Sequence, residues 1–241
     1  MANDYFSFRQ FTIRQERCAM KVGTDGTLLG AWAELPKNLP QRPPRILDIG
    51  TGTGLIALMM AQRFPTAHIV GIDIDEDAVR QAQENVADSP FADRIDIRLQ
   101  SLADMKAQQT DGKAEDAETF DAIVSNPPYF TDALRCPDAQ RSMARHTDTL
   151  SYRTLMDCAW CLLNDDGELS VVVPADCVSQ MESEAILAGF FKRRDCAVKT
   201  TLRKAPKRHL LSFAKHACPL ERTEGLLTSD WHDKLMKDFY L

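Results

Sequence analysis

Several features that mark other protein classes are missing from this 241-residue sequence. It has no run of about 18 apolar residues, so no segment is expected to cross a membrane. The amino terminus lacks the basic and then apolar layout of a signal peptide, which favours a cytoplasmic protein. The seven cysteines are odd in number and scattered, which excludes a complete disulfide framework. Histidine and cysteine show no metal-ligand spacing, so no metal site is predicted.

The formal net charge of −6 argues against a nucleic-acid partner only until the distribution of charge is considered. Residues 192–218 hold nine Lys or Arg and a single acid, Asp195. Attraction of a polyanion depends on the local potential rather than on net charge. The segment could therefore form a phosphate-binding surface on an acidic protein, although a merely solvated set of charges stays open.

Apolar segments alternate with helical patterns from residue 45 onward. Strands are predicted at 45–49, 68–72, 95–99, 120–124 and 169–173, with helices at 55–64, 76–87, 151–163 and 178–188. Fully apolar strands joined by helices are typical of a parallel sheet covered on both faces. Strands at 197–202 and 209–214 are too close in sequence for a crossover helix, so they form an antiparallel hairpin. The sequence thus predicts an α/β fold with a seven-stranded, mostly parallel sheet and one antiparallel strand.

Residues 1–44 are predicted to precede this domain. Residues 6–13 have the pattern of a strand-like flap or hairpin, and residues 21–33 of a loop followed by a short helix. Four prolines within residues 36–44 exclude helix or inner strand and indicate a linker. Residues 45–241 then make one domain that ends in the basic hairpin and a helix at 231–240. The stretch Asn164-Asp165-Asp166-Gly167 predicts a turn.

A glycine-rich loop, Gly50–Gly54, follows the first predicted strand of the domain. Ligands of open α/β sheets bind at the carboxyl ends of the strands. The third glycine comes one residue earlier than in the dinucleotide fingerprint. Asp48, just before the loop, would repel a pyrophosphate but attract a cationic amino-acid group. Asp73 ends the second strand, where a carboxylate can bind both hydroxyls of a ribose.

These residues resemble the motifs of class I S-adenosylmethionine-dependent methyltransferases, which have a Rossmann-like fold. The stretch from Asp48 to Gly54 is similar to their first motif, and Gly71-Ile72-Asp73 to their second. The resemblance implies S-adenosylmethionine as the cofactor, with its ribose on Asp73 and its adenine beside Ser101 and Leu102.

The stretch Ser125-Asn126-Pro127-Pro128-Tyr129 ends the fourth predicted strand. An exocyclic adenine amine or a glutamine amide is a poor nucleophile because its lone pair is delocalised. The Asn126 side-chain oxygen and the Pro127 carbonyl can each accept one N–H bond and so aim the nitrogen lone pair at a methyl group. Tyr129 offers a flat face on which a base can stack. We therefore predict Asn126, Pro127 and Tyr129 as catalytic residues.

The Asn-Pro-Pro-Tyr stretch resembles the motif of amino-methyltransferases that act on adenine N6, guanine N2 or glutamine. Smaller details, Lys21-Val22-Gly23-Thr24-Asp25-Gly26 and Ala144-Arg145-His146-Thr147, are similar to the bacterial tRNA-1(Val) adenine-37 N6-methyltransferase family. Cofactor contacts are then implied for Lys21, Asp25, Asp48, Gly50, Thr51, Gly52, Gly54, Asp73, Ile74, Ser101, Leu102 and Asn126. RNA contacts are expected for Arg141, Arg145, His146, Lys192, Arg193, Arg194, Arg203, Lys204, Lys207 and Arg208.

The resemblance implies tRNA as the partner, with no membrane and no metal, and a monomer is favoured although the oligomeric state stays open. Three alternatives remain. They are a protein glutamine N5-methyltransferase acting on release factors or a ribosomal protein, an rRNA guanine N2 methyltransferase, and a non-catalytic RNA-binding factor. The short region before residue 45 argues against the release-factor enzymes, which resemblance indicates carry a helical domain of about 70 residues there.

Overall fold

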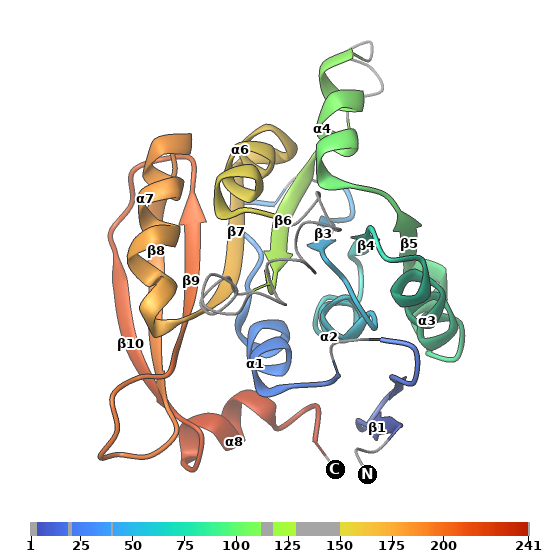
Figure 1. The fold of residues 1–241 in the computed structure, drawn as a ribbon, viewed down its shortest axis with the longest axis horizontal. Coiled ribbons are helices and arrows are strands. Elements are labelled where there is room, and N and C mark those ends of the chain that lie inside the picture. Colours follow the sequence, from blue (N-terminus) through green and yellow to red (C-terminus); the bar gives the residue numbers. More distant parts are fainter. Residues whose placement is uncertain (1–3, 19–20, 40, 112–117, 129–149, 241) are drawn as a thin grey trace, which may run out of the picture.

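The computed structural model describes residues 4–18, 21–39, 41–111, 118–128 and 150–240. In this part of the chain eight strands form one sheet, in the order β10-β8-β9-β7-β6-β3-β4-β5 (Figure 1). Their bounds are β3 (Arg45–Ile49), β4 (His68–Asp73), β5 (Ile95–Leu99), β6 (Phe120–Ser125), β7 (Leu163–Pro174), β8 (Phe191–Lys199), β9 (Arg208–Ala214) and β10 (Glu221–Leu226). Among these strands β9 alone runs antiparallel to both neighbours, so the mostly parallel sheet with one reversed strand is confirmed.

Helices cover both faces of the sheet, as the apolar strands require (Figure 1). The described helices are α1 (Thr24–Trp32), α2 (Leu55–Arg63), α3 (Glu76–Ala87), α4 (Leu102–Asp111), α6 (Tyr152–Leu162), α7 (Val178–Ala188) and α8 (Asp230–Met236). One buried cluster joins α1, α2 and α3 to the first face, and the other joins α4, α6 and α7 to the second. Within the described residues, no helix is long and apolar enough to cross a membrane.

A short antiparallel hairpin precedes α1, as the pattern at residues 6–13 predicts. It consists of β1 (Tyr5–Ser7) and β2 (Thr12–Arg14). The Asn85 side chain accepts a hydrogen bond from the Arg14 N–H and donates to the carbonyls of Arg14 and Thr53, each at 2.9 Å. One buried amide therefore ties the hairpin to α3 and to the glycine-rich loop.

Strands β7 and β8 differ most from the sequence prediction. The turn expected at 164–167 is wrong, because β7 extends through it from Leu163, with a register shift opposite Phe120 and Ala122. The Asn164 side chain donates to Asp121 at 2.7 Å, so tertiary contacts override a local turn composition. The strand expected at 197–202 begins earlier, at Phe191, and ends at Lys199.

An eighth strand, β10, corrects the expected count of seven. It pairs parallel to β8 at the edge of the sheet. Its sequence, Glu-Arg-Thr-Glu-Gly-Leu, is polar because its first four residues are exposed. An edge strand of this kind lacks the apolar run that identifies inner strands.

Candidate functional site

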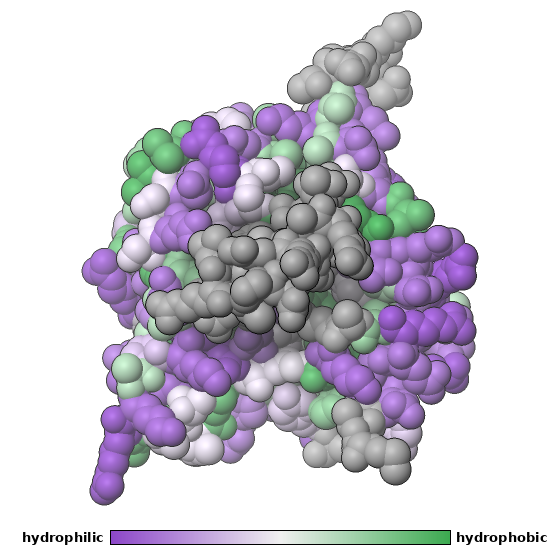
Figure 2. Space-filling view, viewed as in Figure 1, coloured by the Kyte–Doolittle hydropathy of each residue, from purple (hydrophilic) through white to green (hydrophobic). Residues whose placement is uncertain are grey.

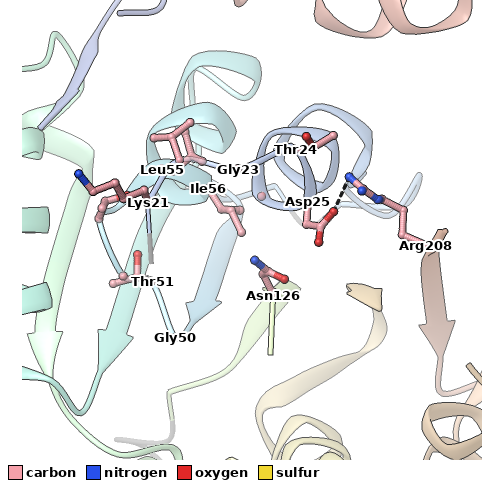
Figure 3. A pocket seen from close by; sticks show the side chains of 14 residues that line it. Lys21, Gly23, Thr24, Asp25, Gly50, Thr51, Leu55, Ile56, Asn126 and Arg208 are labelled. Carbon is pink, nitrogen blue, oxygen red and sulfur yellow. Dashed lines mark ion pairs between the residues drawn. The ribbon is translucent and has the colours of Figure 1, made fainter. Parts of the chain in front are cut away.

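The registers of the central strands bring the two motifs together. Ile49 of β3 pairs with Ser125 of β6, so Gly50 and Asn126 leave neighbouring strands at the same level. Between β3 and β6 the strand order reverses, since the chain continues from β3 to β4 and β5 on one side and from β6 to β7 on the other. Such a reversal opens a crevice at the carboxyl ends of the strands. The structure therefore brings the glycine-rich loop and Asn126 to one site, shown in Figure 3.

The glycine-rich loop turns by means of left-handed backbone conformations. The φ angles are 69° at Gly50, 56° at Gly52 and 79° at Gly54. Residues other than glycine adopt such φ angles only at a cost in conformational energy. A Cβ added at Gly50 or Gly52 would meet no atom within 4 Å, so the loop backbone borders open space. The N–H groups of Gly50 and Thr51 both donate to the Ile72 carbonyl, at 2.9 and 3.0 Å, which fixes the loop to β4.

Asp48 lies beneath this loop and is fully buried. Its Oδ2 accepts hydrogen bonds from the Thr51 hydroxyl at 2.7 Å and from the Ala57 N–H at 3.1 Å. Its Oδ1 has no hydrogen-bond partner among the described residues. Burial raises the pKa of Asp48 from 3.8 to about 7; the two hydrogen bonds oppose this shift, and the charge of Asp73 adds to it. Asp48 thus holds the loop through Oδ2, and Oδ1 is the atom of its carboxylate that remains available to a ligand.

Asp73 ends β4 beside the loop. Its Oδ2 accepts from the Gly52 N–H at 2.9 Å and its Oδ1 from the Asp75 N–H at 3.1 Å. The next residue, Ile74, is 53% exposed, and Leu99 at the end of the neighbouring β5 is 56% exposed. The site therefore offers a carboxylate flanked by apolar side chains that solvent reaches.

The two residues expected beside the adenine have structural partners. The Ser101 hydroxyl hydrogen-bonds Asp104 Oδ2 at 2.7 Å and accepts from the Asp104 N–H at 3.1 Å, which caps α4. The Leu102 side chain is buried in the second core cluster. Only the backbone of Leu102 is left to face a ligand.

A cavity of about 280 Å³ opens between the glycine-rich loop, α1 and Asn126 (Figure 3). It is lined by Lys21, Val22, Gly23, Thr24, Asp25, Gly26, Gly50, Thr51, Gly52, Thr53, Leu55, Ile56, Asn126 and Arg208. Six residues predicted from the sequence for cofactor binding therefore line one cavity, namely Lys21, Asp25, Gly50, Thr51, Gly52 and Asn126. Asp48 does not line it but holds the loop through its hydrogen bond with Thr51. Pro127 follows Asn126 and is buried.

Arg208 lies at the cavity rather than on the open surface of the hairpin. Its side chain is only 12% exposed and forms an ion pair with Asp25, Nη1 to Oδ1, at 2.6 Å (Figure 3). The reason is the reversal of β9, which begins at the carboxyl edge opposite Pro174, the last residue of β7. The antiparallel hairpin was the signal that could have located Arg208 at the cavity.

Other basic residues of the segment 192–218 form ion pairs with carboxylates of the protein. Arg194 is 8% exposed, donates to Glu168 and to Ser212, and lies over the Trp32 ring at 3.9 Å, so the prediction that it contacts RNA is corrected. Arg193 pairs with Glu168 at 3.5 Å. Lys192 pairs with Glu182 and Asp195, at 2.5 and 3.1 Å. In contrast, Arg203, Lys204 and Lys207 are exposed.

Four predicted residues lie outside the described part of the chain. They are Tyr129, Arg141, Arg145 and His146. Within the described residues, no group of three or more His, Cys, Asp or Glu could hold a metal ion.

This chain is similar in sequence and in fold to known methyltransferases. The methyltransferase small domain model matches residues 31–202. A tRNA1(Val) (adenine(37)-N6)-methyltransferase of Bacteroides thetaiotaomicron is 45% identical over 251 residues, with 100% of this chain and 99% of the relative covered. The enzyme of the same name from Mannheimia succiniciproducens is 41% identical, covering 98% and 94%. A crystal structure of a predicted O-methyltransferase from Agrobacterium tumefaciens superposes with a TM-score of 0.66 at 16% identity, covering 89% and 96%, and supports the fold alone. The chain therefore belongs to the methyltransferase small domain family and, within it, to the family of the tRNA1(Val) (adenine(37)-N6)-methyltransferases.

Proposed function

We propose that this protein transfers a methyl group from S-adenosylmethionine to N6 of an adenine in tRNA, the adenine at position 37 of tRNA1(Val). The names and full-length similarity of the relatives support the reaction and the substrate. The family match supports a methyltransferase. A tRNA substrate also implies that the protein works in the cytoplasm.

The residues at the cavity fit S-adenosylmethionine. Gly50 and Gly52 border space that side chains would fill, and Asp48 directs a buried, unpartnered oxygen beneath the same loop. Asp73 would hold the ribose hydroxyls, and the exposed Ile74 would lie against the adenine. Asp25 and Lys21 would bind the amino-acid end, whose ammonium and carboxylate match their charges.

The cofactor supplies a methyl group on a positively charged sulfur, which needs no further activation. Asn126 and Pro127 supply the other requirement, an oriented nucleophile. The Asn126 side-chain oxygen and the Pro127 carbonyl would accept the two N–H bonds of the adenine amine, which directs its lone pair to the methyl group. Proline restricts the backbone, so the carbonyl stays aimed. Tyr129 would stack on the extruded base.

The observation that carries this proposal is the pairing of Ile49 with Ser125, which sets Gly50 beside Asn126. The direct test is transfer of a labelled methyl group to total tRNA, with ribosomal protein and release factor as parallel acceptors. We expect label in tRNA as N6-methyladenine. Label in protein alone would refute the proposal.

The variant Asn126→Ala tests the catalytic role. We expect methyl transfer to fall at least about a hundredfold, because one of two positioning acceptors is lost. Binding of S-adenosylhomocysteine should change little, since the glycine-rich loop is intact. Full activity of Asn126→Ala would refute the mechanism and leave the cofactor assignment standing.

A further inference from the structure

The loop that joins β8 to β9, residues 200–207, lies at the same edge of the sheet as the cavity. The β8 strand runs parallel to β6 and β7 and ends at Lys199. The returning strand begins at Arg208, which lines the cavity. One end of the loop is therefore continuous with the cavity wall, and the rest extends outward at the lower left of Figure 1.

This loop carries those cations of the segment 192–218 that form no ion pair with a described carboxylate. Arg203, Lys204 and Lys207 are exposed, and no ion pair joins them to a carboxylate of the described residues. Figure 2 shows hydrophilic side chains projecting from the corresponding part of the surface. The neighbouring basic residues differ, since Arg194, Lys199 and Arg208 each pair with a carboxylate. The basic surplus of the segment is thus concentrated on this loop.

An apolar side chain stands among these cations. Leu202 is 82% exposed, the largest fraction among the large apolar residues of the described chain. Burial of a leucine is favourable by about 2 kcal/mol, so a partner that covered Leu202 would gain about that much from the contact. Surfaces that bind protein partners are depleted in lysine. In RNA, Lys and Arg can bind the phosphates, and an apolar side chain can pack against an unstacked base.

Backbone hydrogen bonds within this loop and to its neighbours restrain its conformation. The Lys207 N–H donates to the Val198 carbonyl at 3.0 Å, and the Lys207 carbonyl accepts from the Ala175 N–H at 3.1 Å. The Lys204 N–H donates to the Thr201 carbonyl at 3.2 Å. A fixed backbone lowers the entropy lost when a partner docks.

We propose that residues 200–207 are the RNA-docking loop of this enzyme. Arg203, Lys204 and Lys207 bind phosphates of the strand that flanks the target adenine, and Leu202 packs against the base left unstacked when that adenine enters the cavity. The inference rests on the proposed function, because it takes the methyl acceptor to be an adenine in tRNA. Extrusion of a base disrupts stacking, and an apolar wedge compensates for part of that loss.

The test measures binding of an unmodified tRNA1(Val) transcript by fluorescence anisotropy between 50 and 200 mM salt. We expect Lys204→Glu to weaken binding about tenfold or more and to reduce the slope of log affinity against log salt by about 1. Lys204→Gln, which adds no acid, should show a smaller loss of the same sign. Leu202→Ser should weaken binding with an unchanged salt slope. Affinity for S-adenosylhomocysteine should stay within twofold of the native value in all three.

Lys37→Glu is the matched control. Lys37 is an exposed lysine of the segment that leads into the amino end of β3, and it forms no ion pair with a described carboxylate. Its variant should bind the transcript within twofold of the native protein. Equal affinities for Lys204→Glu and Lys37→Glu would overturn the docking loop, as would a loss of methyl transfer without loss of RNA affinity. The binding assay involves no methyl transfer. Methyl label in protein alone would therefore refute the proposed function, whereas the measured RNA affinities would still show whether the loop binds RNA.

Discussion

The buried carboxylate of Asp48 makes stability depend on pH in a direction opposite to that of most acidic residues. Its pKa is about 7 in the folded protein and 3.8 in the absence of burial. Between these values the folded state holds a proton that the unfolded state has lost. Rising pH therefore lowers the free energy of unfolding, and from pH 5 to pH 8 the contribution of this one group falls by about 3 kcal/mol.

The variant Asp48→Asn removes this dependence while it keeps an oxygen for Thr51 and Ala57. Urea unfolding of the native protein and the variant at pH 5, 6, 7 and 8 measures the effect, because other titrations cancel in the difference. We expect the variant to gain about 3 kcal/mol on the native protein over that range. Asp93→Asn is the control, since the Asp93 side chain is 79% exposed, and its difference should stay flat. A constant difference for Asp48→Asn would refute the assignment of a raised pKa.

Three further predictions concern the supports of the cavity. Arg208→Met should weaken the binding of S-adenosylhomocysteine about tenfold, because Asp25 loses its ion-pair partner at 2.6 Å. The affinity for 5′-methylthioadenosine, which lacks the amino-acid end, should stay unchanged when both are measured by calorimetry. Equal losses for the two ligands would contradict the placement of Arg208 at the amino-acid end. Arg194→Met should lower the free energy of unfolding by about 3 kcal/mol, since the buried Glu168 loses a partner, and adding Glu168→Gln should restore part of it in urea unfolding. Gly71→Ala should cost about 2 kcal/mol, because its Cβ would stand 2.6 Å from Ile97 Cδ1; an unchanged unfolding midpoint would show that β4 relaxes.

The sequence predicts most of the carboxyl edge of the sheet because its signals are local. Strands β3 and β5 have the expected bounds, since fully apolar or alternating segments define them. The glycine-rich loop and Asn126 follow inner strands directly, so the order of neighbouring strands is enough to bring them together. The parts that differ depend on tertiary contacts. Edge strand β10 is polar, and β7 passes through a turn-like composition because Asp121 binds Asn164.

Charge counting is the least reliable guide, because the sequence does not tell which cations are paired. Helix α1, which borders the cavity, accounts for the partners of several arginines. At its carboxyl end, Arg63 donates to the carbonyls of Gly30 and Ala33, and Arg194 lies against Trp32. At its amino end, Asp25 pairs with Arg208.

These contacts fix both ends of α1, the helix that brings Asp25 to the cavity, to α2 and to the β8–β9 hairpin. The same hairpin carries the exposed loop at 200–207, and Arg208 is the residue at which that loop meets the cavity. A change in how the loop is held would therefore reach Asp25 through its ion pair with Arg208. If RNA docks on the loop, the hairpin couples the position of the RNA strand that carries the target adenine to the wall of the cavity. The ion pairs of Arg194 and Arg208 thus fix the hairpin that carries the exposed cations Arg203, Lys204 and Lys207.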